Sequence, residues 1–168
     1  LGQDGKLLSE ILIKKKYNII GFIKKKKYKD QVKIKKVIYV KINLNSKKQV
    51  ISILNKYNPS KIVHLGSENP SYTSKKIKNF FYKKNYESTK NLVDCINFFN
   101  PKIHFIFANS SNIFLKKKEF RYNENDIFFS NNDYSRFRIK IYNYLKKLNV
   151  NNNFRYTNLI LFNHDSRL

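Results

Sequence analysis

Short apolar runs alternate along the chain with longer segments in which apolar residues recur at helical spacing. A short apolar run bounded by polar residues is typical of a buried strand, and the longer periodicity is typical of an amphipathic helix. Strands are expected over Asn18–Ile23, Val37–Val40, Ile62–Leu65, His104–Ala108 and Phe154–Phe162. Helices are expected over Lys6–Lys16, Ser46–Tyr57, Ser74–Phe99 and Asp133–Leu148, with Asn85 as a candidate break in the third.

Strands separated by helices predict an α/β fold in which right-handed crossovers wind a parallel sheet. The expected fold class is a Rossmann-like doubly wound parallel sheet, formed by residues 1–168 as a single domain. The first strand of such a fold precedes a glycine-rich turn, but here the turn from Gly2 to Gly5 opens the sequence. We therefore expect the domain to lack its first strand, which lies centrally in the sheet, and to be truncated at both ends.

The composition favours one folded domain. Hydrophobic residues make up 41% of the 168 residues, which is too many for a disordered chain. No apolar run approaches the roughly 20 residues that a membrane helix needs, so we expect no membrane association. Cys95 is the single cysteine, which excludes an internal disulfide framework and suits a reducing cytoplasm. Its place on the apolar side of a helix predicts a core residue.

The formal net charge of +24 suggests nucleic acid as one class of partner. Nearly all of this charge is lysine, however, whereas nucleic-acid sites draw on arginine for bidentate and stacking contacts. The chain is also rich in Asn, Ile, Phe and Tyr and has one alanine, Ala108, a pattern typical of AT-rich coding sequence. We expect a solvated basic surface that attracts anionic nucleotides, with a basic nucleic-acid-binding protein as an alternative.

The turn Gly2-Gln3-Asp4-Gly5 leads directly into a helix and is interpreted as the second half of a phosphate-binding turn. Glycine lets the backbone approach a pyrophosphate, and the helix N-terminus supplies N–H groups and a positive dipole. Two glycines beside an aspartate also form ordinary turns, so the rest of the sequence has to support this interpretation.

Segments in several parts of the chain support the interpretation of Gly2 to Gly5 as a phosphate-binding turn. Gly2 to Glu10 (GQDGKLLSE) resembles the GQDGxxLAE segment of the GDP-mannose 4,6-dehydratase family, and Leu159 to Ser166 (LILFNHDS) resembles its GILFNHES segment. Ile62 to Ser67 (IVHLGS) looks like the family's IYNLAAQSH segment. Phe107 to Phe114 (FANSSNIF) stands where the family has QASTSELY, and Tyr134 to Arg138 stands at its Y-x-x-x-K motif.

Two further segments match less closely. Ile42-Asn43-Leu44-Asn45 occupies the place of the family's DLTD, where an acidic residue approaches the adenine. The helix motif N-x-x-G-T-x-x-L has a counterpart in which serine replaces glycine, namely Asn85, Ser88, Thr89 and Leu92. The matches run in order across nearly the whole chain.

The resemblance implies an extended short-chain dehydrogenase/reductase that uses NADP, or NAD, and a GDP-sugar, with GDP-mannose as the expected substrate. It implies a cytoplasmic homo-oligomer when full length, whose substrate-binding region lies mostly beyond Leu168. We place Lys24 and Lys25 near the adenosine ribose, where positive charge favours the 2′-phosphate of NADP. The other residues implied in cofactor binding are Gly2, Gln3, Asp4, Gly5, Asn43, Leu65, Gly66 and Ser67. The residues implied in substrate binding are Ser111, Asn163 and His164.

The same resemblance implies the catalytic residues. The family oxidises the sugar at C4, eliminates water across C5–C6 and returns hydride to C6. Tyr134 then stands for the proton-transferring tyrosine, Arg138 for the lysine beside it, and Ser110 for the threonine that hydrogen-bonds the C4 hydroxyl. Asn112 replaces the family's glutamate, and an amide cannot accept the C5 proton near neutral pH.

These departures leave several functions open. A site with serine and tyrosine but no carboxylate is also typical of a sugar C4 epimerase or ketoreductase. A catalytically weakened relative that only binds cofactor is a further alternative. The dispersed histidines His64, His104 and His164 suggest no metal site.

Overall fold

The computed structural model describes residues 2–23, 34–67, 75–114, 121–130 and 132–162 of the chain. Lys24 and Lys25 therefore lie outside the described residues. The strands are β1 (Ile19–Ile23), β2 (Val37–Lys41), β3 (Lys61–His64), β4 (His104–Ser110) and β5 (Tyr156–Leu161). The helices are α1 (Gln3–Lys14), α2 (Lys47–Tyr57), α3 (Lys75–Phe99) and α4 (Asp133–Asn152), with a 3-10 turn, η1, at Ser111–Ile113.

All pairings between these strands are parallel, which confirms the predicted sheet type. β1 pairs with β2, and β3, β4 and β5 form a second sheet in that order. In the first sheet Ile19 lies opposite Val37, and in the second Lys61 lies opposite His104. Among the described residues no pairing joins β1 to β3. The sheet is therefore divided at the position where a doubly wound fold has its first strand.

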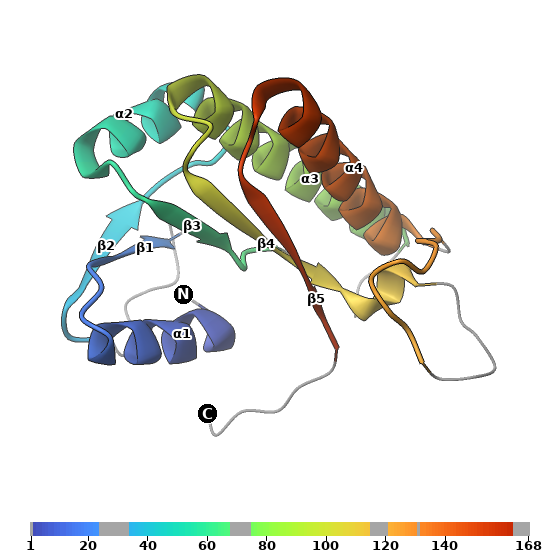
Figure 1. The fold of residues 1–168 in the computed structure, drawn as a ribbon, viewed down its shortest axis with the longest axis horizontal. Coiled ribbons are helices and arrows are strands. Elements are labelled where there is room, and N and C mark those ends of the chain that lie inside the picture. Colours follow the sequence, from blue (N-terminus) through green and yellow to red (C-terminus); the bar gives the residue numbers. More distant parts are fainter. Residues whose placement is uncertain (1, 24–33, 68–74, 115–120, 131, 163–168) are drawn as a thin grey trace.

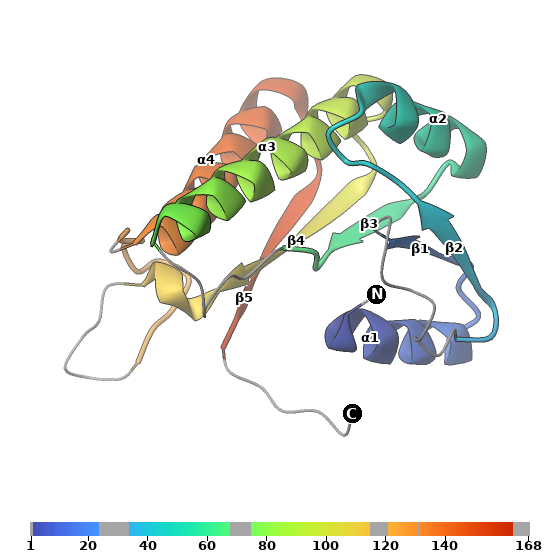
Figure 2. The same cartoon turned by 180° about the vertical axis from the view of Figure 1, so that it is seen from behind.

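The helices cover the strands from two sides. α2, α3 and α4 lie on one side of the strands, and α1 lies on the other (Figures 1 and 2). Long crossovers between parallel strands require such helices, because a tight turn cannot connect two strands that run the same way. The helices on both faces explain why the strand sequences are short apolar runs rather than strict alternations.

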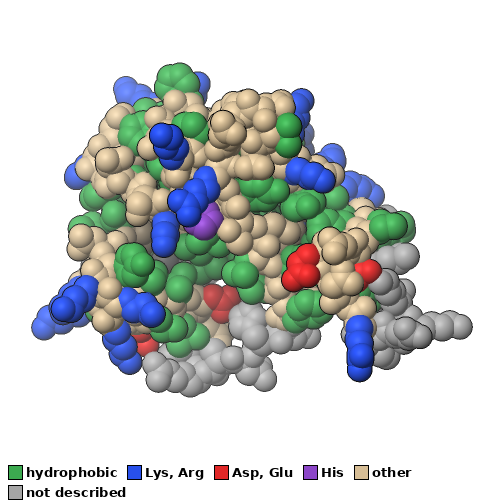
Figure 3. Space-filling view, viewed as in Figure 1, with side chains coloured by type: hydrophobic (Ala, Val, Ile, Leu, Met, Phe, Trp, Pro, Cys, Tyr) green, Lys and Arg blue, Asp and Glu red, His purple; other side chains and the backbone are tan. Residues whose placement is uncertain are grey.

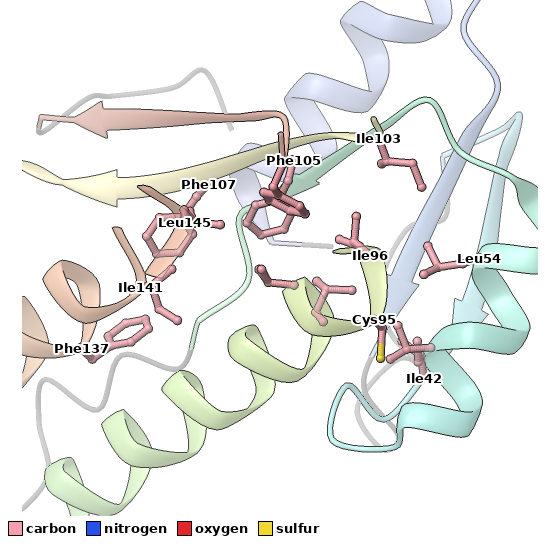
Figure 4. Close-up of a cluster of buried hydrophobic side chains, with 14 residues drawn as sticks. Ile42, Leu54, Cys95, Ile96, Ile103, Phe105, Phe107, Phe137, Ile141 and Leu145 are labelled. Atoms are coloured by element: carbon pink, nitrogen blue, oxygen red, sulfur yellow. The ribbon is translucent and has the colours of Figure 1, made fainter. Parts of the chain in front are cut away.

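The core fills the space between the strands and the layer formed by α2, α3 and α4. Phe105 and Phe107 of β4 point into it, and both are almost fully buried. Figure 4 shows these rings facing Ile141 and Leu145, while Ile42 and Leu54 lie at the other end of the cluster. Cys95 is buried in the same cluster, as predicted. One continuous core thus supports both sheets.

Helix α3 is unbroken, so the candidate break near Asn85 is wrong. Asn85, Thr89 and Leu92 recur at helical spacing and are all buried, so this stripe holds the helix against its neighbours. α4 runs four residues beyond the predicted Leu148, to Asn152, and is capped by Asn153, whose φ of 53° is left-handed. Asparagine adopts that conformation more readily than most residues, so it ends the helix.

The side chains at the helix starts agree with the sequence. Ser46 caps α2 by accepting a hydrogen bond from the Gln49 N–H, as its position predicts. Asn132 and Ser135 form a reciprocal capping box at the start of α4. This box fixes the first turn of α4, from which Tyr134 projects.

Lysine and arginine side chains are scattered over the face shown in Figure 3, both at its edge and near its middle. Such a distribution is typical of a solvated surface, whereas a nucleic-acid site concentrates its cations on one face or helix. Within the described part of the chain, no helix combines the length and the apolarity that a membrane crossing needs.

Candidate active site

The candidate residues lie at the carboxyl ends of the strands. Leu65, Gly66 and Ser67 directly follow β3, Ser110 ends β4, and Asn43 follows β2 at a distance of one residue. In open parallel sheets ligands bind in the crevice at this edge, where the chain leaves the strands for loops. The sequence matches are thus on the edge where a cofactor site belongs.

Arg138 connects the parts of this edge. It lies on α4 and is only 7% exposed. Its Nη1 donates to the Ala108 carbonyl at 2.6 Å, and its Nη2 donates to Ser67 Oγ at 3.2 Å. Its buried Nε has no hydrogen-bond partner among the described residues. The guanidinium therefore ties α4 to β4 and to the loop after β3.

Tyr134 lies one turn before Arg138 on the same face of α4. The Arg138 guanidinium carbon is 4.5 Å from the centre of the Tyr134 ring, close enough for a cation–π contact. Burial lowers the pKa of the Arg138 guanidinium, while the neighbouring phenols of Tyr134 and Tyr82 raise it. The predicted pairing of Tyr134 with Arg138 is present as a direct contact.

Tyr82, on α3, was not predicted to belong to this group. Its ring meets the Tyr134 ring edge-on, with 5.7 Å between the ring centres. Burial raises the pKa of the Tyr82 phenol, Tyr134 and Asp133 raise it further, and Arg138 opposes them. The Tyr134 ring is thus held between Arg138 on its face and Tyr82 at an angle. No local pattern marks Tyr82, because the contact depends on how α3 packs against α4.

Ser110 is held at the end of β4 by its neighbours. Its N–H donates to Asn109 Oδ1 at 2.8 Å, and its Oγ accepts from the Asn112 N–H at 3.3 Å as the cap of η1. Asn109 is buried and donates to Asn158 Oδ1 on β5 at 2.9 Å. Asn109 was missed in the sequence, yet it sets the position of the predicted Ser110.

The side chain of Asn112 is exposed on η1, and Ser111 beside it is half-buried. The position that the resemblance gives to the proton acceptor therefore lies at the surface of the described structure, close to Ser110. An amide there can donate and accept hydrogen bonds but cannot take a proton near neutral pH.

His64 is the last residue of β3 and lies beneath the candidate site, between β4 and α3. It is 8% exposed, its Nε2 lies 3.0 Å from Thr89 Oγ1 on α3, and its ring stacks near Phe105 and Phe107. Burial, with a smaller contribution from Arg138, lowers the pKa of His64 to about 4. The imidazole is therefore neutral near pH 7 and acts as a polar link between β3 and α3.

The predicted phosphate-binding turn begins α1. Gly2 is the N-cap in an extended conformation and offers no side-chain cap to the first N–H groups of the helix. A Cβ built on Gly2 or on Gly66 would meet no heavy atom within 4 Å. Gln3 and Asp4 are exposed in the first turn, while Gly5 is buried and its carbonyl accepts from Ser9 Oγ. The helix N-terminus thus borders open space, as an anion site requires.

The remaining candidates differ in how they are placed. Asn43 is exposed, and its Oδ1 accepts from the Asn45 N–H at 3.1 Å in a local turn before α2. Four candidates lie outside the described residues, namely Lys24, Lys25, Asn163 and His164. Within the described residues, no group of three or more His, Cys, Asp or Glu side chains could hold a metal ion.

Comparison with protein families agrees with the motifs. The family model of GDP-mannose 4,6 dehydratase matches residues 1–168, which is the whole chain. The chain belongs to the GDP-mannose 4,6 dehydratase family. Membership in this family confirms the resemblance inferred from GQDG, LFNHDS and the segments between them. No curated protein sequence matched the chain.

Solved structures with the same fold include UDP-glucose 4-epimerases. The UDP-glucose 4-epimerase from Brucella ovis in complex with NAD is 17% identical, with a TM-score of 0.77 over 92% of this chain and 47% of its own. The Thermus thermophilus UDP-glucose 4-epimerase complex with NAD is 13% identical, with a TM-score of 0.77 over 90% of this chain and 49% of its own. The Thermotoga maritima UDP-glucose 4-epimerase with UDP-glucose is 15% identical, with a TM-score of 0.73 over 92% and 50%.

At these identities the likeness establishes the Rossmann-like fold and nothing finer. The chain spans about half the length of the solved structures that it matches. The described domain of this dehydratase-family chain therefore corresponds to one part of those enzymes.

Proposed function

We propose that this chain is the dinucleotide-binding part of an enzyme that modifies a nucleotide sugar, with NAD(P) as cofactor and transient oxidation at sugar C4 as its first step. The observation that carries the proposal is that Arg138 contacts Tyr134, Ser67 and the Ala108 carbonyl of β4, the strand that Ser110 ends. The family match and the likeness to epimerase structures in complex with NAD support the same conclusion.

The residues present fit a dinucleotide. The uncapped N-terminus of α1 and the open space beside Gly2 suit a pyrophosphate, since helix N–H groups and a missing Cβ allow phosphate oxygens to approach. Arg138 retains N–H donors for ribose hydroxyls beyond the two that it uses. When bound, NAD(P) supplies the hydride acceptor for the sugar.

Tyr134 and Ser110 are proposed to act on the sugar itself. Ser110 Oγ accepts only the Asn112 N–H among its described contacts, so its own hydrogen can be donated to the oxygen on C4. Tyr134 would take the proton of the C4 hydroxyl as the hydride leaves the same carbon. The positive charge of Arg138 stabilises negative charge on a neighbouring phenolic oxygen.

Asn112 determines which chemistry can follow. Elimination across C5–C6 needs a base for the C5 proton, and the amide cannot supply it. We propose that the site retains redox or epimerisation chemistry at C4 and has little 4,6-dehydratase activity. A C4 epimerase or ketoreductase acting on a nucleotide sugar is thus the second candidate.

A third candidate is a weakened relative that binds cofactor without turnover. The contacts of Arg138 favour it, because the Ala108 carbonyl and Ser67 already occupy donors that the family's lysine would direct to the ribose. Arginine also holds its proton more firmly than lysine and is bulkier, so a proton relay through this position should be impaired.

The finer proposals follow from the family. We propose NADP over NAD, on the basis of Lys24 and Lys25, with GDP-mannose as the sugar nucleotide. We also propose that the full-length protein is a cytoplasmic homo-oligomer. If the full-length protein bound NADP and NAD with equal affinity, Lys24 and Lys25 would not select NADP, and this proposal would be wrong.

Product analysis of the complete protein with NADP and GDP-mannose tests the proposed function. Cofactor-dependent change at C4, lost in Tyr134→Phe and retained in the surface control Tyr17→Phe, is the expected result. Rapid formation of the 4-keto-6-deoxy sugar would contradict the claim of a weakened dehydratase. Cofactor binding without any change in the sugar would favour the non-catalytic candidate.

A further inference from the structure

Three basic residues lie next to one another at the amino ends of β3, β4 and β5. Lys61 is the first residue of β3 and lies directly opposite His104, the first residue of β4. Arg155 comes immediately before β5, and its carbonyl accepts from the Phe105 N–H at 3.0 Å. Because β5 starts one residue later, opposite Phe105, Arg155 lies opposite His104. Neighbouring strands are about 5 Å apart, so this basic row spans about 10 Å.

The side chains of the basic row belong to the face of the sheet that is turned away from α2, α3 and α4. Successive side chains of a strand point to opposite faces. Ile62, Phe105 and Phe154, which adjoin the three basic residues in sequence, contribute to the core on the helix side. The basic side chains therefore lie on the other face. Figure 3 shows a histidine side chain beside lysine or arginine side chains near the middle of the view.

His104 is the centre of the basic row. Its Nε2 lies 2.8 Å from Thr157 Oγ1 on β5. Burial lowers the pKa of His104, and the positive charges of Arg155 and Lys61 lower it further. Among the described residues, no carboxylate forms an ion pair with Lys61, His104 or Arg155. The row therefore places basic groups side by side without a negative charge to balance them, and like charges on adjacent strands destabilise a sheet.

Two hydroxyl groups lie beside the basic row. Lys61 Nζ is 5.7 Å from the centre of the Tyr17 ring, and Tyr17 is 48% exposed. Thr157 supplies the second hydroxyl. An arginine fork, a lysine ammonium and hydroxyl donors are the groups with which proteins bind phosphate oxygens. A carboxylate is satisfied by one bidentate arginine, so a row of three basic groups suits an anion with more oxygens and more charge.

The basic row is separate from the candidate active site. His104 and Ser110 stand at opposite ends of β4, about 20 Å apart along the strand. The candidate cofactor and sugar residues lie at the carboxyl ends of the strands, whereas the row lies at the amino ends. An anion bound at the row is therefore a second ligand, distinct from the cofactor.

We propose that Lys61, His104 and Arg155 bind the diphosphate group of a small ligand on the face of β3, β4 and β5 opposite to α2, α3 and α4. The Lys61 ammonium and the Arg155 guanidinium donate to the phosphate oxygens from the two ends of the row, and His104 binds between them as the imidazolium. Nucleic acid would require the cations to continue as a stripe, whereas this row is only about 10 Å long. The proposed function is not needed for this site, because the two share no residue.

The pKa of His104 reports directly on the proposed site. NMR of the complete protein with isotope-labelled histidine measures it, and the His104 signal is assigned by its loss in His104→Gln. The probe is sodium pyrophosphate, and the reference is sodium chloride at the same ionic strength, since salt alone screens exposed charges. Pyrophosphate should raise the pKa of His104 by about one unit, because a bound anion favours the imidazolium. Pyrophosphate should accordingly bind more tightly at about pH 6 than at about pH 8.

Substitutions separate the site from a general effect of salt. Lys61→Gln and Arg155→Gln should each raise the pKa of His104 without any ligand, since each removes a neighbouring positive charge. In the double variant pyrophosphate should no longer shift the pKa of His104. Lys146→Gln, on an exposed position of α4 across the sheet, is the matched control and should behave as the wild type. Lys61, Arg155 and Lys146 are all exposed, so each variant should keep the wild-type melting temperature to within a few degrees.

Three results would overturn the site. One is a pKa of His104 that pyrophosphate changes no more than sodium chloride does. Another is an equal shift by pyrophosphate in the wild type and in the double variant. The third is a single-stranded oligonucleotide that shifts the His104 signal at a lower concentration of phosphate groups than pyrophosphate, which would assign the row to nucleic acid. An enzyme without activity on any sugar nucleotide, but with the expected His104 response, would contradict the proposed function and leave this site in place.

Discussion

The guanidinium carbon of Arg138 lies 4.5 Å from the centre of the Tyr134 ring, one helical turn away on α4. The same guanidinium donates to the Ala108 carbonyl and to Ser67 Oγ. One side chain thus contacts the candidate catalytic tyrosine, the end of β4 and the loop after β3. A change at Arg138 should therefore affect the catalysis, the cofactor and the stability of the domain together.

Replacing Arg138 by lysine should raise the rate of C4 oxidation in the complete protein by about tenfold, because a lysine ammonium is smaller and transfers protons more readily. Loss of the bond to Ala108 should lower the free energy of unfolding by about 1 kcal/mol. The measurement is single-turnover reduction of the cofactor, with Arg138→Gln as the uncharged control. A lysine variant slower than the wild type would show that the arginine is the better group at this position.

Replacing Asn112 by glutamate should create 4,6-dehydratase activity. The side chain of Asn112 is exposed, so a longer side chain can be accommodated without a change in the core. A positioned general base is worth about 100-fold or more in rate. The measurement is the yield of 4-keto-6-deoxy sugar, and Asn112→Gln is the control of equal size without a base. Equal yields from the two variants would remove the role given to this position.

Replacing Gly2 by alanine should weaken cofactor binding and leave the fold unchanged. The φ of −71° suits any residue, and a Cβ there meets no protein atom within 4 Å, so stability should change by less than about 0.5 kcal/mol. A phosphate drawn to the helix N-terminus would meet that Cβ, and we expect the NADP dissociation constant to rise about tenfold. Calorimetric titration measures it. An unchanged affinity for NADP would show that the pyrophosphate does not bind beside Gly2.

Acid should destabilise the domain through His64. Its folded pKa of about 4 lies below the ordinary 6.5, so the unfolded chain binds more protons between these values. Stability is therefore complete above about pH 6.5 and falls as the pH drops toward about 4, by about 3 kcal/mol in total. Urea unfolding across this range is the measurement. His64→Asn should flatten the curve, leaving a smaller slope from His104, whose pKa is also lowered by burial. An unchanged curve would contradict the burial of a neutral His64.

Two phenylalanines provide a matched test of the core. Phe105 is 0% exposed and Phe98 is 75% exposed. Phe105→Ala should lower the free energy of unfolding by about 3–5 kcal/mol, since it removes a large ring and leaves a cavity. Phe98→Ala should change it by less than about 0.5 kcal/mol. Chemical denaturation of the complete protein measures both, and similar losses would show that the core is placed wrongly.

The local features of this protein were predictable from its sequence. Each expected strand is present to within a few residues, because short apolar runs between helices can be buried in only one way in a parallel sheet. The cap at Ser46 was also predictable, since it depends on neighbours within one helical turn. The turn expected over Gly2 to Gly5 is instead the N-cap and first turn of α1, which begins at Gln3 rather than at Lys6. The place of Leu65 to Ser67 and Ser110 at one edge followed from strand direction alone.

The tertiary structure decided the contacts between elements. Tyr82 reaches Tyr134 only because α3 packs on α4, and Arg138 reaches Ser67 across 71 positions of sequence. His64 stands at the end of a strand, and only the packing of α3 and β4 around it, through Thr89 and two stacked rings, makes it a buried neutral group. Periodicity determines which face of an element is apolar, whereas the partner that covers this face depends on long-range packing, which no local pattern records.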